Sequence, residues 1–150
     1  MPALITFGRI IFAVLFIYTG ATKLFGIPAT AEFIAAKVTI PDVLLPYAAQ
    51  LQTLTGLPTA QTLAIAAGGF EVIAGLMIAL NFGARFFSLL LIIFVGVVTF
   101  YFHDFWNQAA PDNAKNLIDA LKNLSIIGAL FMIAGFGRGV SEVENAYDDV

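Results

Sequence analysis

The sequence predicts an all-α integral membrane protein, a four-helix up-down bundle with a short interfacial helix between its first and second spans. Of its 150 residues, 60% are hydrophobic and 11% are charged, whereas soluble domains have roughly 45–50% and about 25%. A water-soluble domain of this length could not cover that much apolar surface. Four long apolar runs, each near the roughly 20 residues that cross a bilayer core as a helix, complete the prediction.

The four predicted spans follow the apolar runs. The fourth is short, and tilting or local thinning of the bilayer accommodates such a mismatch at modest cost. The first resembles a cleavable signal, but Arg9 interrupts it and no positively charged segment precedes it, so we expect it to stay as an anchor. The predicted spans are Leu4–Leu24, Thr62–Leu80, Phe86–Phe105 and Leu121–Phe136.

The connections define the topology. Residues 26–61 include PDVLLPYAAQLQTL, which predicts a short interfacial helix that starts near Asp42 as N-cap and ends before Gly56. The brief NFGAR connection at 81–85 requires antiparallel neighbours. Both termini and this turn then share one membrane surface, called face A, and the connections at 26–61 and 107–120 share the other, called face B. We expect one transmembrane domain over residues 1–139 and an acidic tail over 140–150.

Composition excludes several classes of function. The net charge of −3 and the absence of a basic patch argue against nucleic-acid binding. The chain has no cysteine, so thiol–disulfide chemistry and iron–sulfur ligation by its own residues are excluded. It has one histidine, too few for a conventional zinc site. We therefore expect no metal site and no redox centre on this chain.

Two ionisable residues, Arg9 and Glu71, lie inside predicted spans, where charges are costly and usually face partners in the bundle. Each belongs to a helical stripe of small or apolar residues that predicts a helix-contact face. We predict a buried Arg9–Glu71 ion pair. It would either only lock two helices together or form part of a proton or ligand path. The stripes are Arg9, Ala13, Phe16, Gly20 and Lys23 in the first span, and Ala64, Gly68, Glu71 and Gly75 in the second.

The third span ends in FYFHDFWN at 100–107, which contains the chain's only histidine and only tryptophan. The small and polar residues Ser88, Gly96 and Thr99 share a helical face that leads to His103. The up-down topology brings further polar residues to the same membrane level at face B. The candidate ligand-binding set is Lys23, Glu71, His103, Asp104, Trp106, Lys122 and Asn123.

This set suits a carbonyl-bearing headgroup such as a quinone, which needs hydrogen-bond donors at interface depth and apolar or aromatic walls. Histidine beside an aspartate exchanges protons near neutral pH. The alternatives are that Trp106 belongs to an interfacial aromatic belt and that Lys23 and Lys122 extend to water. Asp104 would then simply end the helix.

Several segments together resemble the DoxX family of small four-helix bacterial membrane proteins. They are FGR at 7–9, GATKLF at 20–25, GGFEVIAG at 68–75, Arg85, HDFWN at 103–107 and LKNLSIIGALF at 121–131. The resemblance runs over about residues 4–139, and LQTLTGLPTAQ at 51–61 looks longer than the family's usual link. It implies a multi-pass protein of the bacterial inner membrane, and the family name comes from a component linked to thiosulfate:quinone oxidoreduction. The positions carried over are Arg9, Lys23, Glu71, His103, Asp104, Trp106, Lys122 and Asn123.

Three functions follow as hypotheses. The first is a membrane subunit of a quinone-linked sulfur or redox oxidoreductase, with a soluble partner holding the redox centre and quinone as the one expected cofactor. The second is a non-catalytic scaffold or assembly factor for redox enzymes. The third is a carrier of small solutes or lipids, which would require a homo-oligomer. The arginines at face A, Arg9, Arg85 and Arg138, favour cytoplasmic termini, although the lysines at face B argue the other way.

Overall fold

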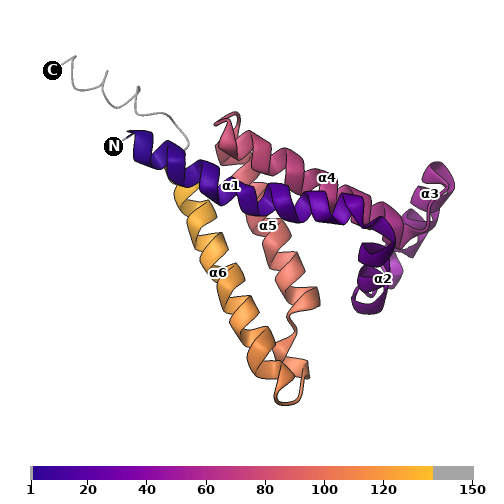
Figure 1. Cartoon of the computed structure of the whole chain (residues 1–150). Helices are drawn as coiled ribbons and strands as arrows, with labels where there is room; N and C mark the ends of the chain where they lie inside the picture. The colour runs from indigo at the N-terminus through magenta and orange to yellow at the C-terminus, as the bar shows by residue number, and fades with distance from the viewer. Residues whose placement is uncertain (1, 137–150) are drawn as a thin grey trace. The chain divides into compact units, whose positions relative to one another are not determined.

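The structure, a computed structural model, describes residues 2–136, and within that range every regular element is a helix. Four helices are long and apolar enough to cross a membrane (Figure 1). The predicted all-α class with four spans is confirmed, and the helices are consistent with a four-helix bundle. The predicted acidic tail at 140–150 and Arg138 lie outside the described residues. The four long helices are α1 (Pro2–Phe25), α4 (Thr59–Ala79), α5 (Ala84–Phe102) and α6 (Asp112–Phe136).

The largest boundary difference concerns α6, which begins at Asp112 and not at the predicted Leu121. The polar segment DNAKNLIDALKN carries no proline or glycine after Pro111, so the helix extends through it without a break. Between α5 and α6 lies a single 3₁₀ turn, η2 (Phe105–Asn107).

The long connection after α1 holds two helices, of which the sequence predicted one. The unpredicted helix is α2 (Ile27–Lys37), whose Pro28 sits in the first turn, where a missing N–H group has no cost. The predicted short helix is confirmed as the 3₁₀ turn η1 (Asp42–Leu44) followed by α3 (Leu45–Thr55).

The predicted N-cap role of Asp42 is wrong. Asp42 opens the 3₁₀ turn, and α3 begins at Leu45 without a side-chain cap. A proline in the first turn of α3 presets its backbone angle and explains why a side-chain cap is dispensable. At the other end Gly56 adopts a left-handed backbone angle, φ 69°, and stops the helix. None of the α3 residues is buried, and its interfacial position remains a prediction.

The chain divides into two compact units. Unit 1 consists of residues 1–14 and 74–150 and includes α5, η2 and α6, with α5 and α6 side by side (Figure 1). Unit 2 consists of residues 15–73 and includes α2, η1 and α3. The second half of α1 and most of α4 also belong to unit 2.

The helix-contact stripes predicted for α1 and α4 are confirmed, because their central members are buried. These buried residues are Ala13, Phe16 and Gly20 in α1 and Ala64, Gly68, Glu71 and Gly75 in α4. On α5 the buried line differs from the predicted small-polar face and shares only Ser88 with it. It consists of Ala84, Ser88, Leu91 and Val95.

Within unit 2, α1 and α4 approach each other at Gly20 and Gly68. A Cβ atom added to Gly20 would lie 2.6 Å from the carbonyl oxygen of Gly68, and one added to Gly68 would lie 2.9 Å from that of Gly20. Both distances are below any ordinary carbon–oxygen contact, and both involve backbone atoms that cannot move aside cheaply. The two helices therefore touch backbone to backbone, as small residues permit in membranes.

This contact generates a matched test at two neighbouring positions of α4. Gly68→Ala should lower the free energy of unfolding by about 1–3 kcal/mol, because its methyl group overlaps the backbone of α1. Gly69→Ala should leave stability unchanged or raise it slightly, since its methyl group meets nothing within 4 Å. Thermal unfolding of the two variants in the same detergent measures the difference, and equal midpoints would contradict the contact.

Candidate functional site

The clearest polar cluster joins Lys23, Thr19 and Glu71 inside unit 2. The carboxylate Oε2 of Glu71 accepts a hydrogen bond from Nζ of Lys23 at 2.8 Å and lies 2.8 Å from Oγ1 of Thr19. The single hydroxyl proton of Thr19 serves either this carboxylate or the carbonyl of Leu15, 2.9 Å away. Glu71 is 3% exposed, while the Lys23 side chain is 30% exposed. A carboxylate this deeply placed is therefore held by one cation and one hydroxyl.

The sequence predicted Arg9 as the partner of Glu71, but in the structure the carboxylate is paired with Lys23 instead. The register explains the choice. A Cβ atom added to Gly20 would lie 2.9 Å from Cβ of Glu71, and Oγ1 of Thr19 lies 2.8 Å from its carboxylate, so Glu71 is level with Thr19 and Gly20. Lys23 is one turn, about 6 Å, further along α1 than Thr19, and its side chain leans back toward the N-terminus. Arg9 precedes Thr19 by ten residues in the sequence, whereas Lys23 follows Thr19 by only four.

Lys23 also shows this backward lean directly, because its Nζ atom lies 3.3 Å from the carbonyl oxygen of Thr19, one turn earlier. The role of Thr19 was not predicted. The available signal was its spacing of four residues before Lys23, which places both on one side of the helix.

His103 ends α5 in unit 1. Its backbone N–H donates to the carbonyl of Thr99 at 3.0 Å, whereas its side-chain Nδ1 is buried and has no hydrogen-bond partner within residues 2–136. Buried polar nitrogen atoms without a partner are costly and rare in native proteins. The Nδ1 atom of His103 is therefore an unsatisfied polar atom at the end of α5.

A short polar chain anchors the neighbouring loop. Oδ1 of Asp104 accepts from Nε2 of Gln108 at 2.6 Å, and Oε1 of Gln108 accepts from Nδ2 of Asn116 at 2.6 Å. These bonds tie the segment after α5 to the second turn of α6. Asp104 therefore has a structural role in holding the loop beside His103.

Asn123 connects α6 to α5 next to this loop. Its Nδ2 donates to Oγ1 of Thr99 at 2.9 Å. Thr99 in turn borders a cavity of about 330 Å³ between the two helices. Phe105 and apolar residues of α6, among them Leu121 and Leu124, form its walls. The Asn123–Thr99 hydrogen bond and the apolar cavity thus both adjoin the last turn of α5.

The remaining two candidates are more exposed. Lys122 has a side chain that is 68% exposed and pairs with Asp119 at 3.0 Å, one turn earlier on the same helix. Trp106 is 51% exposed, with ring centroids 5.0 Å from Phe105 and 5.7 Å from Phe100. The position of Trp106 fits an interfacial anchor that also contacts a wall of the cavity.

The candidate residues thus form two groups. Lys23 and Glu71 meet in unit 2, and the other candidates lie in unit 1. The predicted convergence of Lys23 with the His103 end of α5 remains a prediction. In the part of the chain that the structure describes, no three histidine, aspartate or glutamate side chains cluster as metal ligands would. The group in unit 1 comprises His103, Asp104, Trp106, Lys122 and Asn123.

Four apolar helices with an ion pair inside one helix contact and a polar group at the end of another define a small multi-pass membrane protein. The family model for DoxX matches residues 4–104, more than half of the 150-residue chain, and the chain belongs to the DoxX family. It is also 27% identical to Inner membrane protein YphA of Escherichia coli (strain K12) over 143 residues, covering 95% of this chain and 89% of that protein. This likeness and the four helices support a multi-pass inner membrane protein. A comparison with solved structures found no significant match.

The ion pair in unit 2 can be tested with a double-mutant cycle. Lys23→Met should cost about 1–3 kcal/mol of stability, less than for fully buried pairs because Lys23 keeps partial exposure. Adding Glu71→Met should restore most of the loss, because no unpaired charge then remains in the helix contact. Thermal unfolding in detergent is the measurement.

Lys122→Met provides the matched control, because it removes an exposed lysine from a pair on one helix and should not measurably change stability. The pairing would be contradicted if Lys23→Met left stability unchanged. It would also be contradicted if the double variant lost as much stability as the two single variants added together.

Proposed function

We propose that the chain is the membrane subunit of a quinone-linked oxidoreductase, and that the His103 end of α5 receives the carbonyl headgroup. The observation that carries the proposal is the buried Nδ1 atom of His103, which has no hydrogen-bond partner within residues 2–136. A quinone carbonyl accepts a hydrogen bond from a protonated ring nitrogen. Conversely, a quinol hydroxyl donates one to an unprotonated nitrogen. A histidine is suited to both states because its ring nitrogens can either donate or accept a hydrogen bond.

The surroundings supply the apolar part of such a site. The 330 Å³ cavity beside Thr99 and Phe105 is within the range of small-molecule sites, at its lower end. Its walls are apolar and aromatic, as a quinone ring and the start of its tail require. The polar bridge from Asn123 to Thr99 fixes the spacing of α5 and α6 at this level.

The electrons would come from a partner. Because the chain has no cysteine, it contributes no thiolate ligand for an iron–sulfur centre. A soluble oxidoreductase docked on the membrane surface would supply the two electrons that convert the quinone held beside His103 to a quinol. His103 would deliver one of the two protons required, and water at the membrane surface the other. We place both termini in the cytoplasm, following the arginines at face A.

The chain's single tryptophan offers a direct readout. Trp106 contacts Phe105, which lines the cavity, so a short-chain quinone bound there should quench the fluorescence of Trp106 in a saturable manner. His103→Ala should weaken the apparent affinity roughly three- to tenfold, which corresponds to the loss of one hydrogen bond. Titration of the purified protein in detergent measures this affinity.

Lys115→Met serves as control, because Lys115 is an exposed lysine in the first turn of α6 and does not belong to the candidate group. It should bind like the unmodified protein. Quenching that does not saturate in either the purified protein or its complex, or an affinity unchanged by His103→Ala, would reject the proposal.

A further inference from the structure

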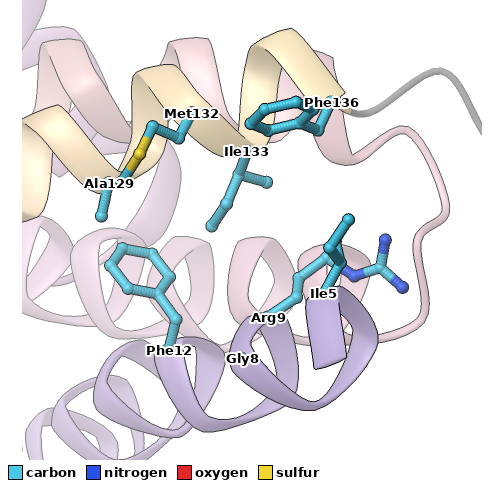
Figure 2. A pocket seen from close by; sticks show the side chains of 8 residues that line it. All are labelled: Ile5, Gly8, Arg9, Phe12, Ala129, Met132, Ile133 and Phe136. Carbon is cyan, nitrogen blue, oxygen red and sulfur yellow. The ribbon is translucent and has the colours of Figure 1, made fainter. Parts of the chain in front are cut away.

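A second cavity lies at the opposite end of α6 from the His103 site. It has a volume of about 240 Å³ and lies between the first turns of α1 and the last turns of α6, all within unit 1 (Figure 2). Its walls include Phe12 of α1 and Met132, Ile133 and Phe136 of α6. Among the lining residues Arg9 is the only charged one. The proposed quinone function uses none of these residues.

Arg9 brings an unsatisfied donor to this apolar cavity. Its Nε atom is buried and has no hydrogen-bond partner within residues 2–136. The guanidinium is charged at every physiological pH and presents a fork of donors that matches phosphate and carboxylate oxygens. Figure 2 shows the guanidinium at the end of the cavity away from Phe12. The cavity is therefore cationic at one end and apolar along the rest.

Arg9 lies near one end of a helix that is long enough to span a membrane. Arg9 lies about 10 Å along α1 from its first residue, Pro2, at 1.5 Å per residue. The other helix of the cavity, α6, ends at Phe136, which also lines the cavity. An arginine at this depth extends toward the interface, where the phosphates of the bilayer lie. Basic pockets between membrane helices are typical binding places for anionic lipid headgroups.

We propose that this cavity binds one anionic phospholipid, with its phosphate against Arg9 and the first part of one acyl chain along Phe12, Met132 and Ile133. The cavity is smaller than usual sites for whole small molecules, so the rest of the lipid remains in the bilayer. The acidic end of this chain, SEVENAYDDV, has four acids that would suit Arg9, but it is a poorer match for the apolar walls because it has no long apolar stretch.

Native mass spectrometry of the full-length protein, released from nanodiscs of equal phosphatidylglycerol and phosphatidylcholine, counts the lipids that stay bound. The unmodified protein should retain phosphatidylglycerol in preference to phosphatidylcholine, roughly tenfold, because the phosphate charge of phosphatidylcholine is already neutralised by its own choline ammonium and that of phosphatidylglycerol is not. Arg9→Gln should abolish that preference. Arg85→Gln, which removes the same charge from an exposed position in the first turn of α5, should leave it intact.

A second variant blocks the cavity while keeping Arg9. Gly8 lines the cavity, and a Cβ atom added there meets nothing within 4 Å, so Gly8→Leu should fill the space without disturbing the helix. It should lower the retention of both lipids at an unchanged melting temperature. Equal retention of the two lipids by the unmodified protein would overturn the proposal. The proposal would also be overturned if Arg85→Gln abolished the lipid preference as Arg9→Gln does, or if Gly8→Leu left lipid retention unchanged.

The acidic end of the chain is the rival occupant, and neutralising it tests this possibility. Replacing Glu142, Glu144, Asp148 and Asp149 with their amides in the full-length protein should not change phosphatidylglycerol retention. A rise in retention would mean that these acids compete for Arg9, and the cavity would then be a site for the chain's own end.

Discussion

The ion pair between Lys23 and Glu71 is the interaction on which the interior of unit 2 depends. Inside a bilayer no water is available to hydrogen-bond a carboxylate, so the carboxylate needs a partner from its own chain. The contact of Gly20 with Gly68 provides that partner, because it brings α1 and α4 close enough for the Lys23 side chain to reach across. The same contact sets the register, and through the register it selects Lys23 over other cations on α1. The ion pair therefore depends on the contact between Gly20 and Gly68.

Satisfied and unsatisfied polar atoms separate structural roles from binding roles in this protein. Glu71 has two neighbouring donors within 2.8 Å, which favours the interpretation that its pair locks two helices together. His103 Nδ1 and Arg9 Nε lack partners within residues 2–136. Arg9 lines one apolar cavity, and His103 precedes by two residues Phe105, which lines the other. Ser88 Oγ is a third such atom, but neither cavity includes Ser88. These two atoms underlie the two proposals, a carbonyl headgroup near His103 and an anionic lipid at Arg9.

Sequence patterns predicted the spans and the contact faces because both depend on local periodicity. The stripe of Ala64, Gly68, Glu71 and Gly75 is visible without any structure, since a helix repeats every 3.6 residues. The partner of Glu71 was not predictable in this way. It depends on the register between two helices and on the direction in which side chains lean. Likewise α2 was missed because IPATAEFIAAK has neither a strong polar cap nor a clear apolar stripe.

The central claim is that Glu71 is bound by Lys23 within the α1–α4 contact. Solid-state NMR on protein in lipid, with ¹⁵N in lysine and arginine side chains and ¹³C in the glutamate carboxyl group, measures this contact directly. The structure predicts a strong dipolar coupling between Glu71 Cδ and Lys23 Nζ, as their 2.8 Å nitrogen–oxygen contact requires. This coupling should disappear in Lys23→Met. A Glu71 carboxyl group that couples to an arginine nitrogen and not to lysine would contradict the account.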